Sequence, residues 1–416
     1  MFDKKLAAIF KRRRRRCRYQ EMRSRRSVTF GAALALALTA TVAVSASPAG
    51  AVETAPAAIP ADCSRDVTAD LTAWFASVPD NSILSFASNG CYRVDGTLVI
   101  AHRSGLTFEG NSATFKQVTD GSELINSKKI RTRNVWTFGT STNLVVRNLT
   151  TVGANPHAGQ GDLAYQPKFE AQHAYFVQGV NGMVMDHVAA YDVYGDFVAL
   201  GGGVANFTVR NSSFARNGRQ GWSINGTNIV FENNTITETR RATIDIEPPT
   251  PMWPSKNIYI RNNDVGPGRL FFFANVGAAA PMDNINIVGN RLHHKAFVMY
   301  VAPPMGTRSN YHVIGNVSDG PVSGFGSAMV FKDVQGLEVR GNSIPTQWSH
   351  HLSGVGVQRG AHVSITNNTF RGAAAALRDR GDNVDITQSN NLVGSVPMGI
   401  QATTREIGPT PKPPAA

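Results

Sequence analysis

The phrase Asn228-Ile-Val-Phe-Glu-Asn-Asn234 decides the fold of this 416-residue chain, because it recurs along most of the sequence. Clear copies begin at Asn143, Asn206, Asn257, Asn284 and Asn310, and degenerate copies begin at Gly105, Gly182, Gly336, His362 and Asn383. From Gly182 onward the copies start 21 to 29 residues apart. A repeat of that length made of short alternating segments is typical of a solenoid, and here it predicts a parallel β-helix.

Each phrase has the pattern of a strand followed by a turn. Apolar residues occupy its second and fourth positions, so one face of a strand is expected to be buried. The asparagine that follows is expected at a tight turn, where asparagines of successive coils can hydrogen-bond to one another. A second strand precedes each phrase, as at 222–224 and 243–247, and a third short strand is expected after the turn.

The segment before the coils has the periodicity of a helix. Its apolar side chains fall at Val67, Leu71, Trp74, Phe75 and Val78. Because a solenoid needs its open end covered, this segment is predicted to form an N-terminal capping helix.

The first fifty residues have the composition of an export signal. A basic region reaches Arg26, an apolar run covers 30–46, and Pro48-Ala-Gly-Ala51 offers small residues for cleavage. This order predicts a secretory signal peptide that is cleaved after Ala51. An uncleaved membrane anchor is the alternative, and Arg25-Arg26 leaves twin-arginine export open. Translation from Met22 instead of Met1 would give a signal of ordinary length.

Little net charge remains once this signal is removed. The whole chain carries +12, and residues 1–51 contribute +10 of it, from 12 Lys/Arg and 2 Asp/Glu. The remaining +2 gives no basic field for binding phosphates. We therefore expect a secreted protein with no nucleic-acid partner and, after cleavage, no membrane partner.

Two cysteines remain in the exported part of the chain. Cys63 lies just before the predicted cap, and Cys91 lies just before the first coil. An even pair in an exported protein favours a disulfide over two free thiols. No cluster of His and Cys has the spacing of a zinc site, so no metal is expected.

These segments divide the chain into five parts. They are a signal peptide (1–51), a linker (52–61), an N-terminal cap with the first strands (62–104), the β-helix (105–395) and a disordered tail (396–416). The β-helix is expected to have about 10–11 coils.

The cap and the first strands resemble a known superfamily. The stretches Pro79-Asp-Asn-Ser-Ile-Leu-Ser-Phe86, Gly90-Cys-Tyr-Arg-Val94 and Leu106-Thr-Phe-Glu-Gly110, followed by the coils, are similar to the pectin-lyase-like right-handed parallel β-helix superfamily. The resemblance covers about 62–395 and implies an all-β, single-stranded right-handed parallel β-helix that acts on a polysaccharide. That superfamily holds pectate and pectin lyases, polygalacturonases, alginate lyases, other glycosidases, epimerases and phage tailspikes. The resemblance supplies no catalytic residues, because the polygalacturonase motifs and the calcium-binding Asp set of pectate lyases have no counterpart here.

A pair of carboxylates is the strongest catalytic candidate. Asp245 and Glu247 are expected on the outer face of a strand because Ile244 and Ile246 face inward. Residues i and i+2 of a strand lie roughly 6.5–7 Å apart. That spacing suits a glycosidase in which one carboxyl acts as acid and the other as base or nucleophile. Asp196, in an earlier coil, is predicted to be a third catalytic carboxylate.

A column of cations is expected beside these carboxylates. Arg219, Arg241, Arg269 and Lys295 each lie three residues before an inward residue of the column Trp222, Ile244, Phe272 and Val298. Coils are about 4.8 Å apart, so four stacked cations require an anion between them. They are therefore predicted to bind an acidic sugar chain or the catalytic carboxylates. His173, beside the long insertion 155–172, and Trp222 are further candidates for contact with the substrate.

Together these features predict a secreted, monomeric enzyme that hydrolyses a polysaccharide without a cofactor. A lyase that cleaves a uronate polymer by β-elimination is one alternative, with Arg or Lys as the base and a calcium ion possible. A non-catalytic β-helix that binds cell-wall glycan, or acts as a scaffold, is the alternative of another class. The concentration of ionisable groups in five adjacent coils favours an enzyme.

Overall fold

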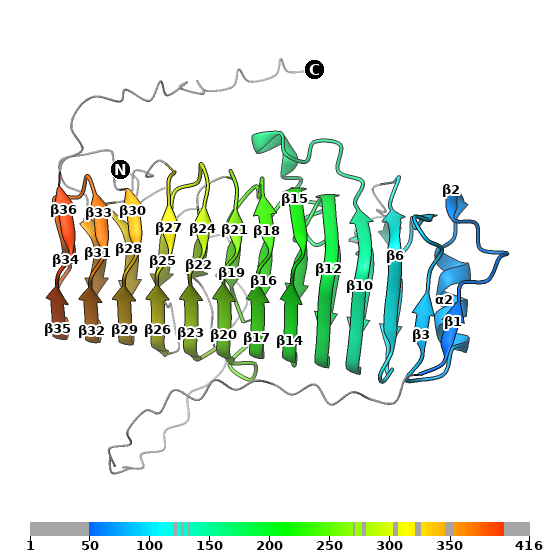
Figure 1. The fold of residues 1–416 in the computed structure, drawn as a ribbon, viewed down its shortest axis with the longest axis horizontal. Helices are drawn as coiled ribbons and strands as arrows, with labels where there is room; N and C mark the ends of the chain where they lie inside the picture. Colours follow the sequence, from blue (N-terminus) through cyan, green and yellow to red (C-terminus); the bar gives the residue numbers. More distant parts are fainter. Residues whose placement is uncertain are drawn as a thin grey trace, which may run out of the picture. The chain divides into compact units, whose positions relative to one another are not determined.

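The structure is a computed structural model that describes residues 50–119, 123–125, 129–131, 134–248, 250–268, 271–276, 280–302, 307–320, 326–345 and 353–394. The predicted tail and nearly all of the predicted signal peptide lie outside these residues. The described part is a parallel β-solenoid of about 11 turns with one short helix near its N-terminal end (Figure 1). The predicted fold class is therefore confirmed.

Each full coil contributes three strands to two sheets. In one coil these are β16 (Trp222–Ile224), β17 (Thr227–Glu232) and β18 (Thr235–Thr237), so the predicted third strand is present. The first strand of each coil belongs to an 11-stranded parallel sheet, here called sheet B, and the other two belong to the larger sheet A. Strands of these two sheets pair with their counterparts one coil away, for example β16 with β19 (Ile244–Ile246).

The remaining strands of sheet B are β5 (Leu98–Ala101), β9 (Trp136–Gly139), β11 (Tyr175–Gln178), β13 (Val198–Leu200), β22 (Phe273–Val276), β25 (Met299–Ala302), β28 (Ser327–Lys332), β31 (Ser353–Gln358) and β34 (Ala375–Asp379). Sheet A contains β1 (Val52–Thr54), β2 (Asp62–Asp66), β3 (Ile83–Ser85), β4 (Cys91–Arg93), β6 (Thr107–Lys116), β10 (Thr142–Val152), β12 (Asn181–Val193), β14 (Ala205–Arg210), β15 (Ser213–Asn217), β20 (Ser255–Arg261), β21 (Asp264–Val265), β23 (Met282–Val288), β24 (Arg291–Leu292), β26 (Arg308–Ile314), β27 (Val317–Ser318), β29 (Val334–Arg340), β30 (Ser343–Pro345), β32 (Ala361–Thr366), β33 (Thr369–Arg371), β35 (Val384–Ser389) and β36 (Leu392–Gly394). A separate antiparallel pair is formed by β7 (Glu123–Ile125) and β8 (Lys129–Arg131).

The recurring asparagines make both the turn and a ladder, as the phrase predicted. Asn228 and Asn233 have φ of 58° and 55°, in the left-handed region that asparagine tolerates better than most residues. The next residue, Asn234, is buried, and its Nδ2 donates to Oδ1 of Asn263 at 3.0 Å. The same bond continues through Asn290, Asn316, Asn342, Asn368 and Asn391. Each coil is thereby fixed to the next at the same corner.

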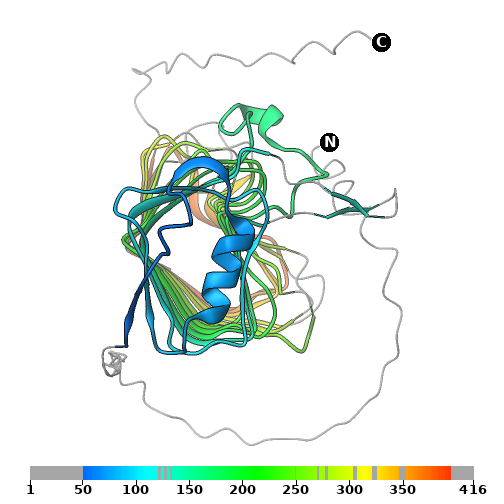
Figure 2. The same ribbon diagram turned by 90° about the vertical axis from the view of Figure 1, so that its right-hand side faces the viewer.

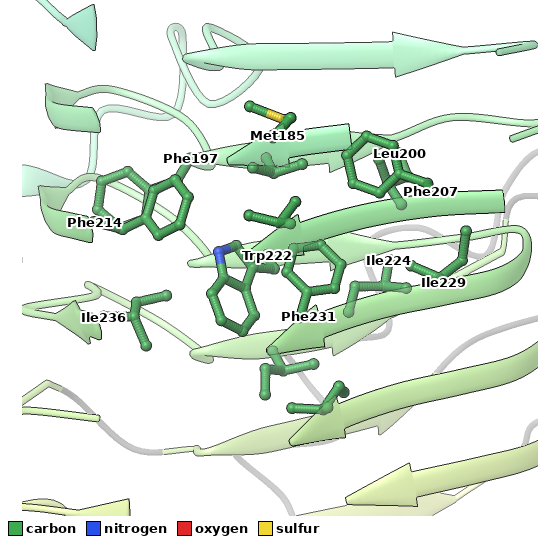
Figure 3. Close-up of a cluster of buried hydrophobic side chains, with 14 of the residues drawn as sticks. Met185, Phe197, Leu200, Phe207, Phe214, Trp222, Ile224, Ile229, Phe231 and Ile236 are labelled. Carbon is green, nitrogen blue, oxygen red and sulfur yellow. The ribbon is translucent and has the colours of Figure 1, made fainter. Parts of the chain in front are cut away.

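Apolar side chains of all three strands meet in the interior of the coils. Trp222 packs on Phe231 with ring centroids 4.4 Å apart, and it meets Phe214 edge-on (Figure 3). Trp222 has no exposed surface. Its predicted contact with a substrate is therefore wrong, because the ring lies in the core.

The N-terminal end of the coils is covered by α2 (Thr68–Ser77), as Figure 2 shows. Leu71, Trp74 and Phe75 are buried, and Phe75 packs edge-on against Phe108 of β6. The predicted disulfide is present between Cys63 of β2 and Cys91 of β4. It ties the segment before the helix to β4, the second strand after the helix.

One part of the predicted inward column is wrong by one residue. Ile244 pairs with Phe273 and not with Phe272, and Phe273 then pairs with Met299 and not with Val298. Adjacent apolar residues such as Phe271, Phe272 and Phe273 give no alternation, so the sequence does not fix the register there.

Candidate active site

The candidate site lies on the outer face of sheet B, over β13, β16 and β19. The strand registers align Phe176, Ala199, Ser223, Asp245, Ala274 and Tyr300 in one column along this face. Ile244 and Ile246, on either side of Asp245, belong to the core. Asp245 is thus the one carboxylate in a column of small and aromatic residues.

Asp245 is covered although it faces away from the core. Its residue surface is 7% exposed, and its Oδ2 accepts a hydrogen bond from Nε2 of Gln220 at 2.6 Å. Burial, together with the charge of Glu247, raises the pKa of Asp245 to about 7, although Gln220 and Arg219 oppose the shift. Asp245 thus faces outward as predicted but is covered, and its carboxyl holds its proton up to neutral pH.

Glu247 follows the last residue of β19 and is half-buried. Its charge is the second largest cause of the raised pKa of Asp245, and it also acts on Arg219. The structure thus brings the two predicted carboxylates together in one electrostatic unit. The negative charge of Glu247 favours the protonated form of Asp245.

Asp196 is the third predicted carboxylate, and it has no exposed surface. Its Oδ2 accepts from Nη1 of Arg219 at 2.5 Å, and its Oδ1 accepts from the backbone N–H of Gln220 at 2.9 Å. Burial raises the pKa of Asp196 to about 6 against the pull of Arg219. The predicted catalytic contact of Asp196 with a substrate is therefore wrong for this structure, because both of its oxygens are bound inside the protein.

Arg219 lies at the centre of the carboxylates. Its side chain is 13% exposed, pairs with Asp196, and has Nε 3.9 Å from Oε2 of Glu170. Burial lowers the pKa of Arg219, but Asp196, Asp245 and the glutamates more than offset this and raise it. For Arg219, the negative charge that was expected between the stacked cations therefore comes largely from carboxylates of the protein itself.

The insertion before β11 covers one side of this cluster. It contains the 3-10 helix η1 (Gly161–Ala164), which stands out from the coils in Figure 1. Tyr165 donates to Oε2 of Glu170 at 2.7 Å, and the guanidinium of Arg241 lies 5.3 Å from the centre of the Tyr165 ring. Among the described residues, Arg241 has no carboxylate within salt-bridge distance.

Residues 250–254, which follow β19 and include Pro251 and Pro254, lie where the sheet B strands end, opposite the insertion 155–172. A side chain at Gly202 would place its Cβ 2.8 Å from Nε1 of Trp253, so the indole packs directly on the glycine backbone. Trp253 is 38% exposed. The two insertions therefore flank the outer face of sheet B at the start and at the end of its strands.

Two further predicted substrate contacts, Lys295 and His173, are hydrogen-bonded inside the protein. Lys295 is 2% exposed, its Nζ bonds Oγ1 of Thr239 at 3.3 Å, and burial lowers its pKa to about 7. His173 is buried, and its Nδ1 accepts from the N–H of Asp196 at 3.0 Å, while burial and Arg219 lower its pKa to about 3. Lys295 is therefore covered by the protein, contrary to the prediction, whereas the substrate contact of His173, whose side chain is 11% exposed, stays a prediction. Arg269 lies outside the described residues.

Gln220, Glu170 and Tyr165 belong to the cluster and were not predicted. Gln220 stands two residues before the core residue Trp222, as Asp196 stands two residues before Val198, so the coil register contained a signal for it. Glu170 and Tyr165 come from an insertion with no register to place them. Within the described ranges, no group of three or more His, Cys, Asp or Glu side chains could hold a metal ion. No described helix is long and apolar enough to cross a membrane.

Comparison with known proteins supports the fold. A family model described as "Right handed beta helix region" matches residues 168–318. No curated protein matches the chain.

Among solved structures, an endo-xylogalacturonan hydrolase from Aspergillus tubingensis aligns with TM-score 0.51 and 13% identity over 83% of this chain and 93% of its own. A tailspike mutant of E. coli bacteriophage HK620, in complex with a pentasaccharide, aligns with TM-score 0.50 and 10% identity over 81% of this chain and 64% of its own. The surface adhesin PfbA of Streptococcus pneumoniae also matches, with TM-score 0.45 and 11% identity over 80% of this chain and 89% of its own. At such identities the likenesses to the hydrolase and the tailspike establish a shared fold and nothing further.

Proposed function

We propose that this right-handed parallel β-helix, whose structural neighbours are pectin-lyase-like β-helix proteins, is a secreted enzyme that hydrolyses glycosidic bonds in a polysaccharide. One observation carries the proposal. The carboxyl of Asp245, with its pKa raised to about 7, stands two residues from the half-buried Glu247 on the outer face of sheet B. Glycosidases use two carboxyls whose surroundings separate their pKa values, one as acid and one as base or nucleophile.

In this proposal Asp245 is the acid, which its raised pKa supports. It donates its proton to the glycosidic oxygen as the bond from that oxygen to the anomeric carbon breaks, and the leaving sugar departs as an alcohol. Glu247 either takes a proton from the attacking water or bonds to the anomeric carbon first, and water completes the hydrolysis. Arg219 stabilises the charge that Asp245 acquires, and Asp196 holds Arg219 in place.

An acidic polysaccharide fits this face best. Arg241 is half-buried beside Tyr165, and within the described part of the chain no carboxylate lies within salt-bridge distance of it. A sugar carboxylate bound there would satisfy the guanidinium. Export of the enzyme is supported by the disulfide between Cys63 and Cys91, since disulfides persist in oxidising compartments.

The test is to incubate the purified mature protein with a panel of neutral and acidic polysaccharides. New reducing ends without ultraviolet absorbance support hydrolysis, whereas absorbance from an unsaturated uronate identifies a lyase. Binding without any cleavage identifies a non-catalytic glycan-binding protein. Asp283→Asn serves as the control variant, because Asp283 is a partly exposed carboxylate on sheet A.

A further inference from the structure

We propose that Gln220 is a positioning residue for the acid: its side-chain amide holds Asp245 in place and turns over when Asp245 gains or loses a proton. The geometry is independent of any reaction. Its consequence for catalysis rests on the proposed function.

Gln220 connects the two buried carboxyl groups. Its backbone N–H donates to Oδ1 of Asp196 at 2.9 Å, and its Nε2 donates to Oδ2 of Asp245 at 2.6 Å. Gln220 is itself 5% exposed, and its Oε1 is buried without a hydrogen-bond partner. A buried amide oxygen without a partner is costly, so this oxygen calls for an explanation.

The proton of Asp245 supplies that explanation. An ionised carboxylate only accepts, so the Nε2 of Gln220 must face it, and Oε1 is left without a donor. A protonated carboxyl has an O–H to donate, and a half-turn of the amide about its last torsion presents Oε1 to receive it. That torsion is broad and roughly two-fold, so both orientations are accessible.

The charged groups around Asp245 cannot hydrogen-bond it in both of its protonation states. Arg219 has donors but no acceptor. Glu247 and Asp196 act on Asp245 through charge, and both raise its pKa. Gln220 is the neutral side chain that hydrogen-bonds Asp245 directly, and its amide can both donate and accept, so it can bond Asp245 in either protonation state.

Removal of the Gln220 amide should raise the pKa of Asp245. The bond from Nε2 favours the ionised carboxylate and lowers the pKa of Asp245. Gln220→Met keeps the length of the side chain and removes the bond, so the pKa of Asp245 rises, by about one unit or tenfold in proton affinity. Gln220→Glu adds a negative charge at the same place and raises the pKa further.

Carboxyl-carbon NMR titration of the full mature chain measures this pKa directly, with the Asp245 signal assigned by its loss in Asp245→Asn. We expect the midpoint to move upward in Gln220→Met and in Gln220→Glu, and to stay in place in Gln335→Leu, a control at an exposed glutamine of β29. The side-chain nitrogen signal of Gln220 in the wild type should titrate together with Asp245. An unmoved midpoint in both variants, or a Gln220 signal that ignores the titration, overturns the proposal.

The proposed function is tested separately by the pH profile. If Asp245 is the acid, the alkaline limb of kcat/KM moves upward in Gln220→Met by the same amount as the NMR midpoint. A shifted midpoint in a protein that cleaves no glycan keeps the role of Gln220 and removes the enzyme. Cleavage with an unmoved midpoint keeps the enzyme and removes the role of Gln220.

Discussion

At the scale of single residues, the site consists of carboxyl groups that the protein keeps out of water. Asp196 and Asp245 are buried, and burial is the largest cause of the raised pKa of each. Burial makes a carboxyl hold its proton near neutral pH, as an acid catalyst must. It also makes the carboxyl destabilising once it is ionised.

The first prediction concerns turnover. Asp245→Asn removes the acid and Glu247→Gln removes the base or nucleophile, so each should lower kcat by about 10²–10⁴-fold. The assay is release of reducing ends from the polysaccharide that the panel identifies. Asp283→Asn should retain wild-type activity, and wild-type activity in both site variants would end the assignment.

The second prediction concerns the stability of Asp245→Asn. The folded pKa of Asp245 is about 7, above the unfolded value, so the native state binds more protons between about pH 4 and pH 7. Stability from this group is therefore full below pH 4 and falls as the pH rises to 7. Asp245→Asn removes this loss and should be more stable than the wild type at pH 8, by up to about 4 kcal/mol, because each pKa unit is worth about 1.4 kcal/mol.

Denaturant unfolding of both proteins at pH 4 and pH 8 measures this difference. The gain at pH 8 should largely disappear at pH 4, whereas Asp283→Asn, at a partly exposed carboxylate, should show no comparable gain at pH 8. A variant that is less stable than the wild type at pH 8 would mean that the carboxylate of Asp245 supports the fold.

At the scale of elements, the ladder of buried asparagines joins the coils. Oδ1 of Asn316 accepts from the N–H and the Nδ2 of Asn290. Its own Nδ2 donates to Oδ1 of Asn342 and to the carbonyl of Ile287. One side chain thus satisfies polar groups on both sides of its own coil.

The third prediction tests this ladder. Asn316→Ala should lower the free energy of unfolding by about 2–5 kcal/mol, because each buried group left without a partner costs about 1–3 kcal/mol. The residue has an ordinary φ, so alanine adds no backbone strain. Asn286→Ala, on the partly exposed face of β23, should cost far less. Equal costs in denaturant unfolding would show that the ladder is not a main source of stability.

The fourth prediction concerns the cap. Cys63 and Cys91 are 28 residues apart, and closing such a loop stabilises by roughly 3–4 kcal/mol in the chain-entropy model. A reducing agent should lower the denaturation midpoint of the wild type and leave a Cys63→Ala/Cys91→Ala variant unchanged. The unreduced, denatured protein should titrate no free thiol, and two free thiols would contradict the bond.

At the scale of the whole molecule, the fold could be predicted from the sequence because each coil uses the same types of residue at the same positions. Asparagine in the left-handed turn and alternating apolar residues on each strand fix the coil, so the fold followed from the phrase around Asn228. The candidate site could be predicted from the sequence only in part. Period-two alternation gave the direction of Asp245, but its burial depends on Gln220 in the neighbouring coil and on insertions outside the repeat. The predicted substrate contact of Lys295 was wrong because the spacing of residues in the repeat shows which side chains stack but not which of them become buried.

The fifth prediction uses the column along sheet B. Phe176 lies three coils before Asp245 and Tyr300 lies two coils after it, a span of about 24 Å at 4.8 Å per coil. Both rings are partly exposed and can stack on sugars of a chain that runs along the column. Phe176→Ala and Tyr300→Ala should raise KM for long chains severalfold and leave kcat nearly unchanged. Equal effects on disaccharide and polymer would contradict such extended binding.

The direction of the buried asparagine bonds gives this ladder an electrical polarity of its own, opposite to that of the outer ladder through Asn206, Asn228, Asn257 and Asn284. Each amide presents its oxygen to the preceding coil and its nitrogen to the following one, from Asn234 to Asn368. Dipoles aligned head to tail add, as they do along a helix, and aligned hydrogen bonds polarise one another. The stack is therefore positive toward its C-terminal coils, independently of the net charge of the chain. A carboxylate can end such a stack at that side but cannot continue it, because it has no proton to pass on.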